Sequence, residues 1–345
     1  MINKIKKNII FIKKIIDIDK LKIIYKNNIN KIKKYDKNNF NKYITVKQKI
    51  NYLNKIINIY NKILLNYKDV KLLKILSLKE NISIIDNDLY KYYINIKKLI
   101  DELKYIIFNN EHDINSAIIQ ITSGAGGNDS SNWVKIISKM YELWSIKNNY
   151  KVSIINCTYI NSNCIKNIVL EIQGKYAYGL LKFENGIHKL IRIYNNKRHT
   201  SFASVNVFPL IKNDKSIYIN EKDIKYQTFR SSGSGGQNVD KVESGVRLIH
   251  KPTNISIVCT KTRSQNINKL YALKLLKSKL KLIKKTKTTK KNKIEWGYHN
   301  RNYIMHPYKM IKDLNTGYKT SNLDYILNGN IDDIINEYIK LSIIN

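Results

Sequence analysis

The spacing of hydrophobic residues in the N-terminal part of the chain predicts helices. Apolar side chains recur there every three or four positions, so they share one helical face. Three series follow this rule: Ile5, Ile9, Ile12 and Ile16; Ile50, Leu53, Ile57, Tyr60 and Leu64; and Ile85, Leu89, Tyr92, Ile96, Leu99, Leu103 and Ile106. Residues 36–41 interrupt the pattern. We therefore expect a small antiparallel helical domain in which these residues serve packing.

The period changes near residue 115. Ala117, Ile119 and Ile121 fall on alternate positions, which is the period of a half-buried strand. A glycine-rich turn over 123–129 then leads into a helical pattern. That pattern contains Trp133, Ile136, Ile137, Met140, Tyr141 and Trp144. Further strands are expected at 151–159, 166–173 and 176–184.

A third unit starts near Ser216 and combines short strand patterns with one long basic helix. The strand patterns lie at 216–219, 225–229, 245–250 and 255–260. The helix is expected to place Leu270, Leu273, Leu276 and Leu280 on its apolar side, before the lysine run 284–293. The tail from 322 to 344 is helical in pattern again. Helices segregated from strands in this way predict an α+β fold.

Charge indicates a polyanionic partner. The 345 residues include 62 Lys and Arg against 26 Asp and Glu, which gives a net charge of +36. Such a surface attracts the phosphate backbone of nucleic acids. Lys, Ile and Asn are also favoured by AT-rich genomes, so a merely solvated lysine surface is the alternative. The hydrophobic share of 43% is enough for cores and excludes a simple disordered polycation.

Several classes of protein are excluded. The three cysteines, Cys157, Cys164 and Cys259, are too few and too irregularly spaced for a disulfide framework or a zinc ribbon. No apolar stretch is long enough for a transmembrane helix. Lysines 6, 7, 13 and 14 interrupt the apolar N-terminus, which argues against a secretory signal. The glycine-rich segments match neither a Walker A loop nor a dinucleotide-binding fingerprint.

The second glycine-rich segment, Gly233-Ser-Gly-Gly-Gln237, suits a tip that enters a crowded site. Glycine permits close backbone approach, and a glutamine offers both a donor and an acceptor. Four basic residues near it are candidates for phosphate contacts: Arg230, Lys241, Arg247 and Arg263. Taken alone, Gly-Gly-Gln is equally compatible with a flexible turn.

The surrounding sequence resembles the signature of bacterial class I peptide chain release factors. The match runs through Phe229-Arg-Ser-Ser-Gly-Ser-Gly-Gly-Gln-Asn-Val-Asp-Lys-Val-Glu-Ser-Gly-Val-Arg247. Matches in the same order are Ser123 to Trp133, Tyr176-Ala-Tyr-Gly-Leu-Leu, Gly186-Ile-His-Lys-Leu-Ile-Arg192, Arg263-Ser-Gln-Asn-Ile-Asn-Lys269, Glu295-Trp-Gly297 and Ile311-Lys-Asp-Leu-Asn-Thr-Gly317. Arg198-His-Thr-Ser-Phe-Ala-Ser204 is closer to the release factor 2 branch of that family. The resemblance covers roughly residues 17–340 and is weakest in the N-terminal helices.

The resemblance implies a translation termination factor that acts only within the ribosome and is not a free-standing enzyme. Such factors read a stop codon in the A site and hydrolyse the peptidyl-tRNA ester in the peptidyl transferase centre. Gly235, Gly236 and Gln237 are the implied catalytic residues, with the backbone N–H of Gln237 as an oxyanion-type donor. N5-methylation of Gln237 is common in the family. No cofactor and no metal are implied.

By the same matching, codon recognition falls to Gly126, Gly127, Asp129, His199 and Thr200. The His199 ring is expected to stack on the codon, and the Thr200 hydroxyl to contact the third base. Asp129 stands where the family has glutamate, one methylene longer, so an identical first-base contact is not expected. The segment Arg192-Ile-Tyr-Asn-Asn-Lys-Arg198 lacks the Ser-Pro-Phe tripeptide of release factor 2 and is shorter. Either codon choice is altered, or UAA reading persists through His199 and Thr200, with UGA in doubt.

The family fold implies four parts: a helical N-terminal domain (1–109), an α/β decoding domain (110–210), a small α+β domain carrying Gly-Gly-Gln (211–300) and a C-terminal segment (301–345) that packs back on the decoding domain. The implied partners are the ribosome, the mRNA stop codon and P-site peptidyl-tRNA, with a glutamine methyltransferase and a recycling GTPase as further candidates and no membrane. We expect the bacterial cytoplasm, with an organelle as the alternative. The rival functions are a codon-independent ribosome rescue hydrolase and a non-catalytic RNA- or ribosome-binding protein.

Overall fold

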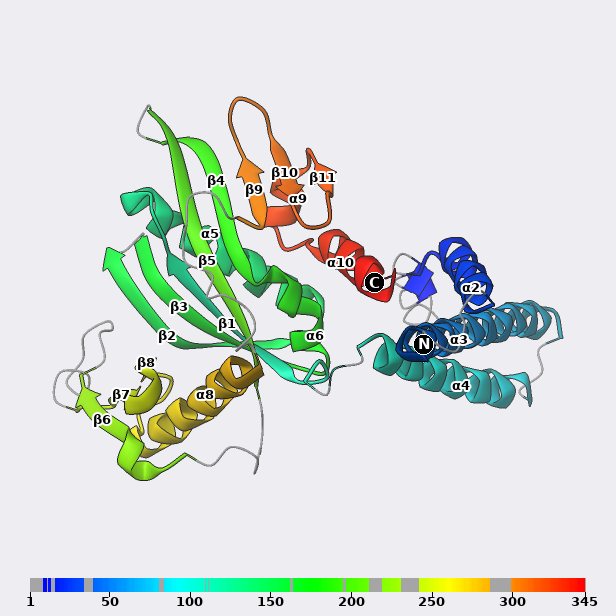
Figure 1. Cartoon of the computed structure of the whole chain (residues 1–345), viewed down its shortest axis with the longest axis horizontal. Helices are drawn as coiled ribbons and strands as arrows, with labels where there is room; N and C mark the ends of the chain where they lie inside the picture. Colours follow the sequence, from blue (N-terminus) through cyan, green and yellow to red (C-terminus); the bar gives the residue numbers. More distant parts are fainter. Residues whose placement is uncertain are drawn as a thin grey trace. The chain divides into compact units, whose positions relative to one another are not determined.

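The chain divides into two compact units. The computed structural model describes residues 9–10, 12–13, 16–33, 40–80, 84–108, 110, 112–161, 164–194, 197–210, 219–230, 242–285 and 299–344. One unit comprises Met1–Asn109 together with Asn336–Asn345, and the other comprises Asn110–Ile335. Figure 1 traces both units in sequence colours from the blue N-terminus to the red C-terminus.

The first unit is helical, as the apolar spacing predicts. Its helices are α2 (Ile18–Ile32), α3 (Phe40–Glu80) and α4 (Ile84–Ile107), joined by the end of α10 (Asp332–Ile344). Asp17 caps α2, since its carboxylate accepts a hydrogen bond from the backbone N–H of Lys20 at 3.2 Å. The core uses the expected faces of α3 and α4, and includes Leu53, Ile57, Tyr60, Ile96 and Leu103. Ile5 lies outside the described residues.

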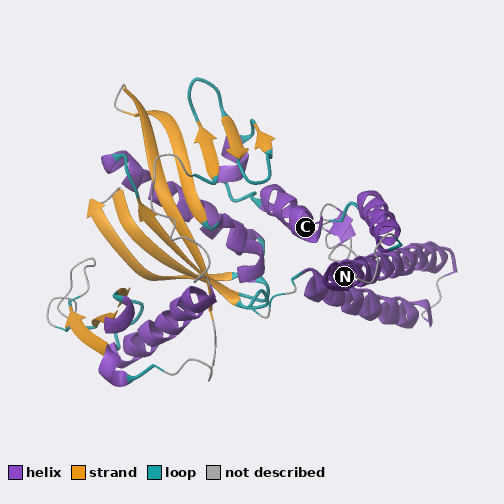
Figure 2. Cartoon of the chain, in the orientation of Figure 1, coloured by secondary structure: helices purple, strands orange, loops and turns teal. Residues whose placement is uncertain are grey.

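The second unit is built on an eight-stranded sheet, drawn in orange in Figure 2. Its strands are β1 (Ser116–Ser123), β2 (Lys151–Asn161), β3 (Cys164–Gln173), β4 (Gly186–Tyr194), β5 (Lys197–Leu210), β9 (Arg301–Ile304), β10 (Met310–Asp313) and β11 (Lys319–Thr320). The order is β11-β10-β9-β4-β5-β1-β3-β2. The neighbours pair antiparallel except β4 and β9, which run parallel. Residues 301–320 therefore complete the sheet begun by residues 116–210.

Both faces of the central strand β1 are covered. Ala117, Ile119 and Ile121 are fully buried on the side of helix α5 (Gly127–Lys147), as the alternation predicts. Ile118 on the opposite side is buried too, at 1% exposure, in a cluster with residues of α8 (Gln265–Lys285). A half-buried strand was expected, and the difference arises because α8 packs on the face that the sequence pattern left open to solvent.

A second, three-stranded sheet carries the ends of the Gly-Gly-Gln segment. Its order is β6 (Ile224–Phe229), β7 (Gly245–His250) and β8 (Ile255–Cys259), all antiparallel. The remaining short elements are α6 (Ala177–Leu181), α9 (Leu323–Leu327) and the 3-10 turns Lys182–Glu184, Glu221–Asp223 and Lys251–Thr253. Leu248, Ile257 and Leu276 share one core with Ile118 and Ile155 of the large sheet. The expected combination of helices and sheets in an α+β protein is thereby confirmed.

The strand expected at 176–184 is wrong. Residues Ala177–Leu181 form α6, and the next strand starts only at Gly186. Tyr176 has a left-handed backbone (φ +67°) at the start of the helix. The backbone N–H groups of Tyr178 and Gly179 donate to Asn115 and Asp113 in the loop before β1. Over so few residues an apolar pattern fits one helical turn as well as a strand, and these tertiary hydrogen bonds favour the turn.

One further expectation needs correction in part. Leu276 and Leu280 of α8 are buried and Leu273 packs against the same core, as expected, but Leu270 is 60% exposed, and Ala272 and Leu275 join the core in its place. Residues Asn336–Asn345 group with Met1–Asn109 in the helical unit, and the expected domain bounds, with 301–345 as one segment, stay a prediction. The strand proposed at 216–219 and the lysine run 284–293 fall largely outside the described residues.

Candidate functional site: a glycine turn and a strand held together

The glycine-rich turn before α5 is fastened to β5. The backbone N–H of Gly124 donates to Phe202 O at 2.8 Å, and the N–H of Phe202 donates to Ala125 O at 3.0 Å. Gly126 follows with φ +127°, and a Cβ there would lie 2.6 Å from Ser201 Oγ and 2.9 Å from Ser201 Cα. Only glycine fits so close to the strand in this conformation. Gly127, at φ +59°, has open space beside it.

His199 and Thr200 lie on the same strand, immediately before this contact. Both are partly exposed, while Ser201 and the two residues after it are buried. Successive side chains of a strand point to opposite faces, so His199 and Ser201 share the face toward α5 and Thr200 faces the other way. The sequence placed Gly126 and Thr200 more than seventy positions apart. In the fold, Gly126 lies against Ser201, the residue that directly follows Thr200.

The segment that departs from the family pattern is a tight hairpin. β4 and β5 remain paired up to Tyr194 and Lys197, which leaves Asn195 and Asn196 as the connection. These two residues lie outside the described part of the chain. Because the strands extend this far, there is no loop of the length that would carry an additional tripeptide.

Asp129 is buried, with 1% of its side chain exposed. Its Oδ1 accepts hydrogen bonds from Arg192 Nε at 2.9 Å and from Arg192 Nη2. Its Oδ2 accepts from Ser201 Oγ at 2.6 Å. Arg192 also donates to Asn132 Oδ1, one turn further along α5. Both carboxylate oxygens are thus engaged within the protein.

The residues Gly235, Gly236, Gln237 and Lys241 lie outside the described part of the chain, but the ends of their segment are described. Phe229 and Gly245 are directly paired at the end of β6 and β7. A Cβ at Gly245 would come within 2.7 Å of the Phe229 ring, so glycine allows that ring to lie across the strand.

A buried asparagine on α8 supports the same segment end. Asn268 Nδ2 donates to Ser244 O at 2.9 Å and to Thr262 O at 2.7 Å. Its Oδ1 accepts from the backbone N–H of Thr262 at 3.0 Å. This fully buried side chain was part of the quoted sequence match but had not been singled out. The remaining phosphate candidates, Arg230, Arg247 and Arg263, are all exposed.

Behind the site, a buried ionic network fastens β9 and β10 to the rest of the sheet. Arg301, 1% exposed, binds both oxygens of Glu184 at 2.7 and 2.8 Å and Asp313 at 3.1 Å. Burial opposes the charge of Arg301, but Glu184 and Asp313 raise its pKa well above the usual value. Burial and the charge of Arg301 lower the pKa of His188 to about 4, so this ring is neutral near pH 7. No sequence motif pointed to this network.

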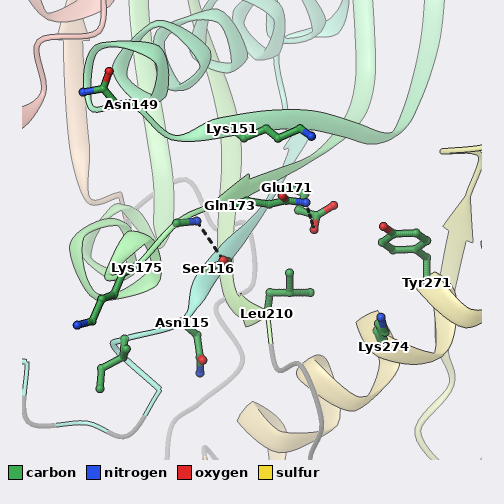
Figure 3. Close-up of a pocket in the computed structure, with 12 residues that line it drawn as sticks. Asn115, Ser116, Asn149, Lys151, Glu171, Gln173, Lys175, Leu210, Tyr271 and Lys274 are labelled. Atoms are coloured by element: carbon green, nitrogen blue, oxygen red, sulfur yellow. Dashed lines mark hydrogen bonds between the residues drawn. The ribbon is translucent and has the colours of Figure 1, made fainter.

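One cavity lies apart from these residues. It has a volume of about 880 Å³ and is bordered by Lys151, Glu171 and, from α8, Tyr271 and Lys274 (Figure 3). Glu171 forms an ion pair with Lys261. None of the candidate codon-recognition residues, all of which the structure describes, lines this cavity. Within the described ranges, no cluster of three His, Cys, Asp or Glu residues suits a metal ion, and no helix is long and apolar enough to cross a membrane.

The chain belongs to the peptide chain release factor family. Residues 25–205 match the PCRF domain, which spans the turn, α5 and the β4–β5 hairpin, and residues 212–315 match the RF-1 domain, which contains Gly-Gly-Gln. The resemblance based on motifs is therefore confirmed.

The individual proteins that this chain is similar to are named peptide chain release factor 2. The chain is 43% identical over 252 residues to peptide chain release factor 2 of Thermotoga sp. (strain RQ2), covering 70% of this chain and 68% of the relative. It is 43% identical over 240 residues to peptide chain release factor 2 of Helicobacter pylori (strain P12), covering 67% and 66%. The solved structure of release factor 2 of Thermus thermophilus matches with a TM-score of 0.65 at 26% identity, over 91% of this chain and 93% of that one.

Proposed function

We propose that this chain ends translation at UAA codons, with the glycine turn and the His199–Thr200 strand as the codon reader. Family membership makes it a stop-codon-recognising peptide chain release factor, which acts on the ribosome. The observation that carries the residue assignment is the pair of backbone hydrogen bonds between Phe202 and the turn at Gly124 and Ala125. They hold Gly126 and Gly127 beside the strand that bears His199 and Thr200.

The chemistry of these residues suits single-stranded RNA. An imidazole stacks on an unstacked base, and a hydroxyl both donates and accepts hydrogen bonds at a base edge. His199 and Thr200 point to opposite faces of one strand, so they are suited to separate neighbouring bases of a codon. The short hairpin lacks the Ser-Pro-Phe element. We therefore assign UAA to this chain, and release measured on UGA ribosomes decides whether UGA is read as well.

For the hydrolytic step we propose Gly235, Gly236 and Gln237. Water adds to the ester carbonyl, the ester C–O bond breaks, and the products are a free peptide carboxyl group and a tRNA ribose hydroxyl. The backbone N–H of Gln237 would stabilise the charge that develops on oxygen. Arg230, Lys241, Arg247 and Arg263 would contact RNA phosphates, where each Lys or Arg adds a salt-dependent attraction.

Further partners follow from the same proposal. Gln237 is a candidate for N5-methylation by a glutamine methyltransferase, and a recycling GTPase is a candidate for removing the factor after release. The bacterial cytoplasm is the proposed compartment. A codon-independent rescue hydrolase is the second candidate, and it is favoured by the short hairpin alone.

Replacing His199 distinguishes these two candidates. His199→Ala is expected to raise the factor concentration for half-maximal release on UAA ribosomes by about tenfold or more, because a stacked base contributes roughly 1–3 kcal/mol. The release rate at saturation should stay within about threefold, since the ring does not touch the ester. Single-turnover peptide release measures both quantities. Tyr325→Ala, an exposed ring on α9, is the control. Equal half-maximal concentrations for both variants would favour rescue.

A further inference from the structure

The buried carboxylate of Asp129 joins three elements that meet at the codon reader. It lies in the first turn of α5, two residues after Gly127. Through Arg192 it binds β4 at the residue that pairs with His199 across the hairpin. Through Ser201 it binds β5 at the residue that follows Thr200. Register places Arg192, His199 and Ser201 on the same face of the sheet, toward α5.

Geometry excludes the carboxylate itself as a partner for RNA. Both oxygens accept hydrogen bonds from inside the protein, and the side chain is 1% exposed. A codon base could reach it only by displacing Arg192 or Ser201, which would leave a buried charge uncompensated. A buried acid with a cationic partner on one oxygen and a hydroxyl on the other is instead suited to fix the distance between those partners.

We propose that Asp129 is a positioning residue for stop-codon reading: its carboxylate holds the His199–Thr200 strand in register with the glycine turn. This inference rests on the proposed function of those residues. Gly126 supplies the other half of the contact, because the absence of a Cβ lets Ser201 come close enough to bond Asp129. Arg192 is the electrostatic partner, and its second bond to Asn132 keeps the guanidinium over α5.

The test uses Ser201→Ala and Asp129→Asn, with Ser204→Ala as the matched control. Ser204 lies on the same strand, and its hydroxyl accepts a hydrogen bond from Asn206 at 3.2 Å, away from Asp129. Ser201→Ala removes one hydrogen bond without burying an unpaired charge, so it remains informative if Asp129→Asn fails to fold. We expect both variants to raise the half-maximal concentration on UAA ribosomes about five- to tenfold, with the saturated release rate within about twofold of the parent.

A second readout does not depend on release. In protein labelled at histidine, the imidazole resonances of His199 should shift in Ser201→Ala, while those of His250 on β7 should not. If Ser201→Ala matches Ser204→Ala in half-maximal concentration and leaves the His199 resonance in place, Asp129 has no positioning role. If the resonance shifts but the parent protein releases peptide equally at every codon, the positioning holds and the proposed codon-reading function is wrong.

Discussion

Gln237→Pro is expected to slow peptide release by about 100- to 1,000-fold while leaving UAA-dependent binding to the ribosome intact. Proline has no backbone N–H, so this substitution removes the donor assigned to the developing oxyanion. Loss of one such donor has a cost of that order in other oxyanion sites. Binding is expected to persist because the substitution leaves the proposed codon-reading pair His199–Thr200 and the arginines proposed to contact phosphates unchanged. Release is measured in a single turnover at saturating factor.

Two controls isolate the N–H from other effects of the substitution. Gln237→Ala removes the side chain and keeps the N–H, so its loss should be at least tenfold smaller than that of Gln237→Pro. Asn238→Pro introduces the same ring one residue later and also keeps the N–H of Gln237. If Gln237→Ala and Gln237→Pro slow release equally, the side chain and not the backbone is the catalytic group. If neither slows release, the Gly-Gly-Gln segment has no hydrolytic role.

The largest expected effect on stability belongs to Arg301. Arg301→Met should lower the free energy of unfolding of the sheet by about 3–5 kcal/mol, because it leaves Glu184 and Asp313 buried without a cation. Both carboxylates are completely buried, but Glu184 is the more affected partner, since both of its oxygens bind the guanidinium whereas only one oxygen of Asp313 does. Burial raises the pKa of Glu184, but the charge and hydrogen bonds of Arg301, together with His188 and the hydrogen bond from Tyr141, outweigh burial and hold the pKa of Glu184 below its ordinary value.

Lys309→Met is the matched control for this prediction. It removes one positive charge from the same part of the chain, but its ion pair with Asp324 is exposed, with 58% and 68% of the two side chains accessible. Such pairs contribute below about 1 kcal/mol. Urea unfolding followed by the fluorescence of the buried Trp133 and Trp144 measures both variants. Trp133 contacts Tyr303, the neighbour of Arg301, at 4.9 Å between ring centroids. If Arg301→Met and Lys309→Met lower the free energy of unfolding equally, the buried network does not stabilise the sheet.

The sequence pattern predicted most helices and strands, because the spacing of apolar residues within one segment largely determines which element that segment forms. The hydrophobic period identifies α4, α5, β7 and β8 to within a few residues, and it identifies the middle of α3, which extends well beyond the series 50–64 at both ends. The period failed at Ala177–Leu181, where hydrogen bonds to the loop before β1 decide between a turn of helix and a strand. On α8 it placed Leu276 and Leu280 correctly but not Leu270, because the orientation of the helix is set by its packing on Ile118 and other residues of the large sheet.

The site was predictable in its residue types but not in its contacts. Gly126, Gly127 and the His199–Thr200 pair were assigned from the resemblance to the family's motifs, and their role in codon recognition stays a prediction. The engagement of Asp129 was not predicted, because its partners, Arg192 and Ser201, are more than sixty positions away. The same holds for Arg301 and Glu184, which are 117 positions apart. Long-range polar pairs have no periodic signal in one sequence, and only the folded chain reveals them.

The most direct test of codon-dependent release uses ribosomes that hold a labelled peptidyl-tRNA and present UAA, UGA, UAG, a sense codon or an empty A site. Gln237→Ala sets the level for release with an impaired hydrolytic segment. We expect rapid release on UAA and only background release on the sense codon and the empty site. The UGA sample shows whether the tight hairpin narrows codon choice. Equal release from every A site would contradict codon reading and identify a rescue hydrolase, and no release above background at any codon would contradict the hydrolytic function itself.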